Sequence, residues 1–201
     1  MLAWPVIKRI LEYCRDDDAK EFEFRFSINT NASLMTPVIA AALKEYRVEV
    51  ASSLDGLRDG NDRVRQTKFG SGTFSQIVRG FEILAEAEYP IGGFAVTITE
   101  KNFCELDESI IDWASAHGMK KVRIDIDVVG MVKIPVEDVV EKILRIRRYA
   151  ALHSIDVPGF WARPAENLNE STLEDHIAFC GAVRGNSICI VNNQTKGVRS
   201  G

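Results

Sequence analysis

The chain has 201 residues, 46% of them hydrophobic, and a formal net charge of −4. This length and apolar content suffice to bury the core of a globular domain, and the negative charge argues against a general nucleic-acid-binding protein. No apolar run reaches the length of a membrane-spanning helix, and the first residues lack the order of a secretory signal peptide. We therefore expect a cytoplasmic protein without a membrane partner.

Strands and helices are predicted to alternate along the chain. The apolar pattern predicts helices over 4–15, 37–46, 73–88, 106–117 and 135–153, and strands over 22–29, 47–53, 92–99 and 121–128. Thr36 and Pro37 form an N-cap and a first-turn proline, Thr73 and Gln76 suggest a capping box, and residues 55–71 form a loop. Four strands separated by helices indicate an α/β protein built from parallel βαβ units, for which a barrel is the known closed arrangement.

Each predicted strand has one polar and one apolar side, because successive side chains point to opposite faces. The polar sets are Arg25, Ser27 and Asn29; Glu49, Ala51 and Ser53; Thr97 and Thr99; and Arg123, Asp125 and Asp127. Helices must cover the apolar side, so we expect the polar side to enclose water or a polar ligand. The alternative is an internal network of ion pairs, Arg25 with Glu49 and Arg123 with Asp125.

A candidate ligand site lies where the strand 47–53 ends. There the chain supplies a hydroxyl, a carboxylate and a glycine, at Ser53, Asp55 and Gly56, to the edge where open α/β sheets and barrels place their ligands. Arg65 follows, and its guanidinium can take a carboxylate bidentately. In the alternative reading, Asp55 and Gly56 make an ordinary turn and Arg65 pairs with a nearby acid.

These segments, in this order, resemble radical S-adenosylmethionine (radical SAM) enzymes of the SPASM group. The family pattern Ser-Leu-Asp-Gly, then His-Asp-x-x-Arg, is matched at 53–56 and 61–65, with Asn61 in place of histidine. Residues 24–36 resemble the third strand of that family and its Thr-Asn-Gly-Thr signature, with Ala32 in place of the glycine. Residues 70–84 resemble the glycine-rich start of its fourth helix, and the segment around Cys180 resembles the opening of the SPASM extension.

The resemblance implies a partial, open barrel of the radical SAM type over residues 1–165, with about four βα units present, and the start of a SPASM-type extension over 166–201. It also implies that S-adenosyl-L-methionine binds at the strand ends. By position, Ser53 matches the ligand of the cofactor ribose, Arg65 that of the methionyl carboxylate and Asn31 a neighbour beside it, with Asp55 in the same cofactor loop. Cys180 matches the first ligand of an auxiliary iron–sulfur cluster.

The sequence lacks the family's defining cysteine motif. It contains no Cys-x-x-x-Cys-x-x-Cys, the three thiolates that hold the catalytic 4Fe-4S cluster, and no Gly-Gly-Glu segment. Residues 1–13 resemble the helix that follows that segment in the family. We therefore expect an internal fragment of a longer enzyme, with the cluster bound by the full-length protein and not by this chain. Cys14 and Cys104 are expected to be small apolar residues on helices, and Cys189 to pack in a strand.

For the full-length protein, the resemblance implies an iron–sulfur oxidoreductase that cleaves S-adenosyl-L-methionine to a 5′-deoxyadenosyl radical and modifies a peptide or protein. The chain alone is not expected to catalyse this reaction. One alternative is a complete but clusterless barrel that binds a peptide or a small molecule. Another is a non-radical barrel enzyme with Asp125 or Asp127 as its base. The unpaired edges of an open sheet also favour self-association.

Overall fold

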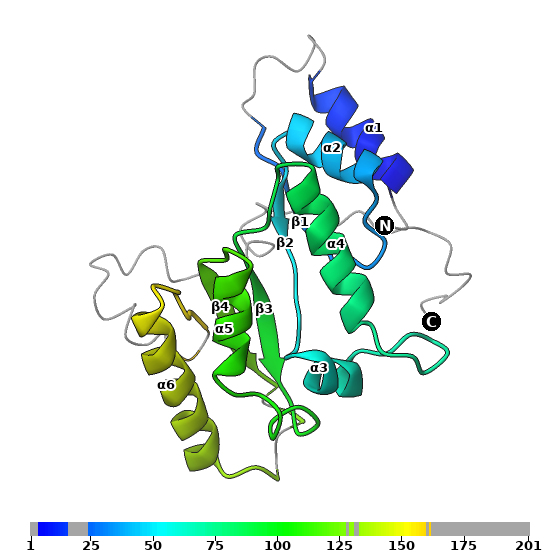
Figure 1. Ribbon diagram of the computed structural model, residues 1–201. Helices are drawn as coiled ribbons and strands as arrows, with labels where there is room; N and C mark the ends of the chain where they lie inside the picture. Colours follow the sequence, from blue (N-terminus) through cyan, green and yellow to red (C-terminus); the bar gives the residue numbers. More distant parts are fainter. Residues whose placement is uncertain (1–3, 16–23, 128, 131–132, 160, 162–201) are drawn as a thin grey trace, which may run out of the picture. The chain divides into compact units, whose positions relative to one another are not determined.

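The structure, a computed structural model, describes residues 4–15, 24–127, 129–130, 133–159 and 161 (Figure 1). The chain divides into two units, Met1–Trp161 and Ala162–Gly201. The described residues all belong to the first unit. The expected SPASM segment, with Cys180 and Cys189, lies outside them.

Helices and strands alternate in the described part as the sequence predicts. The elements are α1 (Trp4–Arg15), β1 (Ser27–Asn29), α2 (Pro37–Glu45), β2 (Glu49–Ala51), α3 (Arg58–Val64), α4 (Phe74–Glu86), β3 (Gly93–Ile98), α5 (Ser109–Ala116), β4 (Lys121–Ile126) and α6 (Val136–Leu152). The prediction of an uninterrupted loop over 55–71 is wrong, because α3 lies within it. This helix has no side-chain cap at Leu57 and contains Gly60, so it carries neither a capping signal nor a strong propensity.

The strands pair in the order of the sequence, and every pairing is parallel. In β1 and β2, Ser27 lies opposite Glu49; in β3 and β4, Gly93 lies opposite Lys121. A single bridge, Ser53 to Ala95, joins the two pairs. In the described residues β1 pairs with β2 alone, so β1 lies at an edge of this part of the sheet.

A fifth extended segment continues the sheet beyond β4. The backbone amide of Val122 donates to the carbonyl of Asp156 at 2.9 Å, and that of Ile124 donates to the carbonyl of Pro158 at 2.8 Å. The Trp161 indole nitrogen then donates to the carbonyl of Ile124 at 3.0 Å. Residues 156–158 therefore run parallel to β4, and Trp161 secures the end of this segment.

The predicted alternation of polar and apolar sides is confirmed in β3 and β4, whereas Phe24, on the predicted apolar side of the first strand, is 41% exposed. Phe94, Val96 and Ile98 of β3 are buried, while the residues between them are half-buried. The apolar side packs against residues of three helices: Ile77 and Leu84 of α4, Ile110 and Ile111 of α5, and Val139, Ile143 and Ile146 of α6. The helices thus cover one face of the sheet and leave the polar face uncovered by them.

Trp113 of α5 is the centre of an aromatic cluster in this core. Its ring lies 5.7 Å from that of Phe94 on β3, and 6.4 Å from each of the rings of Phe74 and Phe81 on α4, measured between centroids. Aromatic pairs at such distances add to the stability gained from burial. The cluster therefore packs α4, α5 and β3 against one another.

The two predicted helix starts have different outcomes. Thr36 caps α2 as predicted, because its hydroxyl accepts a hydrogen bond from the Ile39 amide at 3.3 Å. The capping box at Thr73 is wrong: the Thr73 side chain does not cap α4, and the Asp62 carboxylate accepts from the Phe74 amide at 2.8 Å instead. The Thr73 hydroxyl donates to the Arg65 carbonyl at 3.1 Å. The start of α4 is thereby tied to the predicted ligand loop.

Candidate functional site

Asp55 holds Arg65 at the end of β2. Asp55 is buried, with 2% of the whole residue exposed. One of its oxygens, Oδ2, accepts from Arg65 Nε at 2.6 Å, and the other accepts from the Thr97 amide of β3 at 2.8 Å. The predicted alternative, in which Arg65 pairs with a nearby acid, is therefore present in the structure. The pair also links the loop to the neighbouring strand.

The ion pair uses only one edge of the Arg65 guanidinium. Within the described residues, the two terminal nitrogens of Arg65 have no hydrogen-bond partner, and the side chain is 29% exposed. A guanidinium carries five N–H donors, and a fork of two of them matches the two oxygens of a carboxylate. Arg65 is thus oriented by the protein and still able to bind an anion.

Asn102 is a supporting residue that the sequence did not single out as part of the site. Its side chain is fully buried. The amide nitrogen donates to the carbonyls of Asp55 at 2.8 Å and Thr97 at 2.9 Å. The amide oxygen accepts from the Thr99 amide at 2.7 Å and from the Thr99 hydroxyl at 3.0 Å. Asn102 therefore fixes the backbone of Asp55 against β3. Its position after a strand was the only signal in the sequence.

Asn61, which stands where the family pattern has histidine, is also buried. Its oxygen accepts from the Asp55 amide at 3.2 Å, and its nitrogen donates to Asp62 at 3.0 Å and to the Thr73 hydroxyl at 3.4 Å. An amide can accept and donate at the same time, as this position requires. Asn61 thus links Asp55, at the start of the segment between β2 and α4, to Thr73, at its end.

Ser53 and Asn31 lie at the same edge of the sheet as Asp55. Ser53 is half-buried, and its hydroxyl makes no hydrogen bond within the described part of the chain. Asn31 follows β1 and is exposed; its oxygen accepts from the Ser33 amide at 3.2 Å and the Ser33 hydroxyl at 2.9 Å. The Thr30 amide donates to the Ala51 carbonyl at 3.0 Å, which holds this loop beside β2. The structure therefore gathers all four predicted cofactor residues at one edge.

Ala32, in the same loop, occupies a position suited to glycine. Its φ of 57° lies in the left-handed region, which residues other than glycine rarely adopt. Helix α4 approaches this loop closely, because a Cβ added to Gly80 would lie 2.2 Å from the Ala32 carbonyl oxygen. The family pattern has glycine at this position, which suits the left-handed conformation. This chain has the same conformation with alanine.

Asp125 of β4 and Asp127, which follows β4, both have partners within the protein. Arg123 Nε donates to Asp125 at 2.6 Å, so the second ion pair of the predicted alternative is present. Asp127 accepts from the amides of Val129 at 3.3 Å and Gly130 at 3.1 Å, as in a turn.

The described residues contain no group of three or more His, Cys, Asp or Glu side chains that could hold a metal ion. Cys14 is half-buried on α1, whereas Cys104 is exposed in a turn before α5, so the prediction that Cys104 packs on a helix is wrong.

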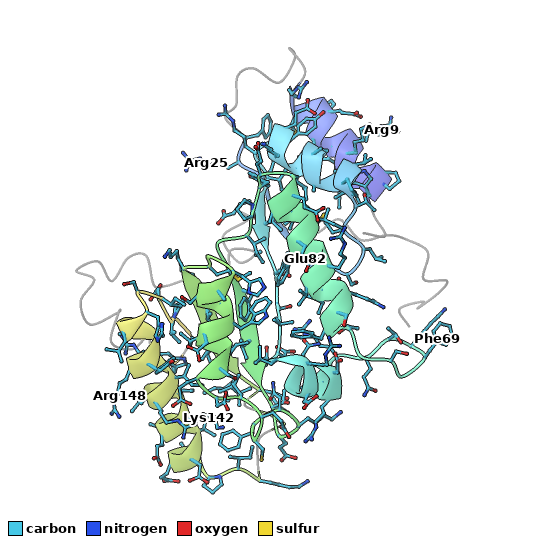
Figure 2. All side chains as sticks on the ribbon, in the orientation of Figure 1. Arg9, Arg25, Phe69, Glu82, Lys142 and Arg148 are labelled. Carbon is cyan, nitrogen blue, oxygen red and sulfur yellow. The ribbon has the colours of Figure 1, made fainter. Side chains whose placement is uncertain are left out.

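None of the described helices is long and apolar enough to cross a membrane. Figure 2 shows the side chains of this part, with Phe69 at the tip of the loop between α3 and α4, 82% exposed.

No protein-family model matches the chain. The radical SAM cyclopropyl synthase TigE of Paramaledivibacter caminithermalis is 28% identical over 185 residues, which are 90% of this chain and 38% of TigE. The mycofactocin maturase MftC of Mycolicibacterium smegmatis is 39% identical over 83 residues, which are 40% of this chain and 20% of MftC. The solved structure of native anSMEcpe with bound AdoMet and the Cp18Cys peptide has a TM-score of 0.66 at 16% identity, covering 79% of this chain and 46% of that chain.

The chain spans less than half of the length of each of these proteins. The likeness to anSMEcpe covers the alternating parallel strands and helices described above, so the predicted fold, an open barrel of the radical SAM type, is confirmed. The matches to TigE and MftC show that the likeness holds in sequence as well as in fold. The resemblance read from the sequence is thereby confirmed: the chain is similar to radical SAM proteins, among them a cyclopropyl synthase and a maturase.

Proposed function

We propose that this chain forms the S-adenosyl-L-methionine-binding part of a radical SAM enzyme that modifies a peptide. The observation that carries the proposal is the Arg65 guanidinium, which Asp55 holds at the end of the sheet with two nitrogens open. The names of TigE and MftC, a synthase and a maturase, and the AdoMet and peptide bound by anSMEcpe support the same assignment.

The residues at this edge suit the polar groups of the cofactor. In the proposal, Arg65 takes the methionyl carboxylate through its open nitrogens, and the Ser53 hydroxyl bonds the ribose. Asn31 lies beside them and offers an amide nitrogen that has no partner within the described residues. Both Asp55 oxygens are engaged inside the protein, so its proposed role is to orient Arg65.

The 4Fe-4S cluster of the proposed enzyme belongs to the full-length protein, with Cys180 as the first ligand of an auxiliary cluster. When bound, cofactor and cluster supply a 5′-deoxyadenosyl radical for hydrogen abstraction from the peptide. The chain's own residues bind and orient the cofactor. A cytoplasmic location and self-association through the edge of β1 are further parts of the proposal.

Equilibrium dialysis of the chain against radiolabelled S-adenosyl-L-methionine tests the proposal. We expect saturable binding that Arg65→Ala weakens about tenfold or more, since a charge-assisted hydrogen bond is worth about 1.5–3 kcal/mol. Ser53→Ala should weaken binding less, because a neutral hydroxyl contributes about 1 kcal/mol. Arg63→Ala is the matched control: this arginine lies on α3 but pairs with Glu105. Equal affinities in the Arg65→Ala and Arg63→Ala variants would refute the assignment, as would the absence of saturable binding.

A further inference from the structure

Helix α6 is held by the rest of the described structure along two of its sides. One side is buried in the core and carries Val139, Ile143, Ile146 and Ala150. The neighbouring side is bonded to α5 and to the turn before it: its side chains are Lys142, Arg145 and Tyr149, and their partners are Leu106, Glu108 and Asp112. Both of these sides are occupied, so the outer side of α6 is the one left to contact another molecule.

The outer side of α6 carries a row of exposed apolar side chains. Val136, Val140, Leu144 and Leu152 are 70%, 48%, 36% and 82% exposed. Their positions differ by multiples of four, and rows of every fourth residue form the ridges that interlock in the commonest class of helix packing. Apolar side chains scattered singly over a surface are ordinary, whereas a row of them along one helix marks a contact surface.

Two residues of opposite charge, Glu141 and Arg148, accompany this row. Both are exposed, and neither forms an ion pair within the described residues. They stand two helical turns apart, so they lie on the same side of α6. Figure 2 shows Arg148 on the side of α6 that faces away from α5. The point midway between the two charges lies next to Leu144, at the centre of the apolar row.

An antiparallel pairing of α6 with α6 of a second copy would satisfy both charges at once. A two-fold axis through this midpoint places Glu141 of each copy beside Arg148 of the other. Each charge then lies about 5 Å along the helix from the axis, at 1.5 Å per residue. The same axis brings the two Leu144 side chains together and sets Val140 against the aliphatic stem of Arg148. A parallel pairing would instead oppose like charges.

We infer that the outer side of α6 is a self-association surface, through which two copies of the chain form an antiparallel dimer with two-fold symmetry. A second copy fits because the surface is complementary to itself, with an acid toward one end, a base toward the other and leucine between them. A contact made by one helix from each copy is smaller than the about 1,200–2,000 Å² of stable interfaces, so the dimer is weak and reversible. The surface lies outside the proposed cofactor site and does not depend on the proposed function.

Sedimentation velocity of the full chain at rising concentration tests the inference. We expect reversible dimers, weakened about tenfold by Glu141→Arg or by Arg148→Glu, because either change turns two attractive pairs into repulsive ones. The variant with both changes restores the pairs in exchanged positions and should regain the wild-type affinity. Lys68→Glu, the same charge change at an exposed residue outside α6, should leave the affinity unchanged. A chain that stays monomeric, or dimers that ignore the changes in α6 and so form through another surface such as the β1 edge, would overturn the inference.

Disulfide cross-linking tests the position of the two-fold axis. Leu144→Cys should form a disulfide between copies under mild oxidation, because residues beside a two-fold axis come within reach of each other. Val136→Cys is the matched control on the same helix: it is more exposed, but the two copies of it would lie about 25 Å apart along the helices. It should cross-link no more than the wild type, which reports the background from the native cysteines. Equal cross-linking of both variants would overturn the inference, as would a monomer whose Leu144→Cys thiol is protected from maleimide by another part of the chain.

Discussion

Arg65 meets Asp55 through Nε alone, at 2.6 Å, with side-chain exposures of 29% and 3%. An arginine paired end-on through both terminal nitrogens would offer a ligand only its side edge, made by Nε and one terminal nitrogen. Here the Asp55 carboxylate contacts only Nε, and the two terminal nitrogens of Arg65 stay open. The same pair therefore provides both stability and the capacity to bind.

A double-mutant cycle on this pair should show strong coupling. Asp55→Ala should destabilise the chain by about 1.5–3 kcal/mol, because it removes a charge-assisted hydrogen bond and a partner of the Thr97 amide. The double variant, with both Asp55→Ala and Arg65→Ala, should lose much less stability than the two single variants lose in sum, since groups in contact couple by about 0.5–3 kcal/mol. Urea denaturation measures all four variants. Arg79→Ala, which removes only surface ion pairs, serves as the control and should leave the stability nearly unchanged. Additive single changes would contradict the pairing.

Gly80→Ala should destabilise the chain although it lies in a helix. Alanine favours a helix over glycine by up to about 1 kcal/mol. The added Cβ, however, would lie 2.2 Å from the Ala32 carbonyl oxygen and 2.9 Å from the Ala32 carbonyl carbon, and backbone atoms cannot simply move aside. Overpacking of this kind costs about 1–3 kcal/mol. Thermal denaturation should show a lower melting temperature for Gly80→Ala and little change for Gly92→Ala, whose Cβ would meet nothing within 4 Å. A melting temperature at or above that of the wild type would disprove the close contact.

Ser109→Ala should alter the response of the chain to acid. The hydrogen bond from the Ser109 hydroxyl, with a further bond from the Ser109 amide at 2.9 Å, lowers the pKa of Asp107. A lowered carboxyl pKa gives stability that is present above the unfolded value and is lost as pH falls through the folded value. The stability difference between wild type and Ser109→Ala should therefore shrink below about pH 4. Urea denaturation between pH 7 and acid measures it, with Ser115→Ala as the control on the same helix. A difference that stays constant with pH would speak against the hydrogen bond.

The 201-residue chain should not hold a stoichiometric 4Fe-4S cluster. A cluster of this kind needs closely placed thiolates, whereas Cys14 and Cys104 lie on separate elements and the sequence has no Cys-x-x-x-Cys-x-x-Cys. Iron and sulfide analysis after anaerobic reconstitution should find less than one cluster per chain. One full cluster per chain, lost on changing Cys14, Cys104 or Cys189 to Ser, would contradict this expectation.

The fold was predictable from the sequence because its signals are local and repeated. The alternation of apolar and polar residues in β3 and β4 places Phe94, Val96 and Ile124 in the core, where the structure has them. Thr36 with Pro37 marks the start of α2 correctly. Such patterns report burial and capping directly, so they are read without tertiary information.

The ligand loop was less predictable, because its order comes from tertiary hydrogen bonds. Helix α3 contains Gly60 and Asn61, and its conformation is supported by the bonds of Asn61 to Asp55 and Thr73. At α4, Asp62 lies twelve residues before the amide that it caps, so the nearer Thr73 was the wrong choice. The burial of Asn102 between two carbonyls likewise has no local signature.

Each strand of this sheet lies beside the strand that precedes it in the chain. Chains emerge from the ribosome with their first residues leading, and domains begin to form during synthesis. When β2 emerges, β1 is already available, and the same holds for β3 and β4 in turn. Loop-closure costs stay small when partners are near in sequence, and rates of folding are correspondingly higher. The sheet can therefore assemble in the direction of translation, each new βα unit covering the exposed edge of the unit made before it.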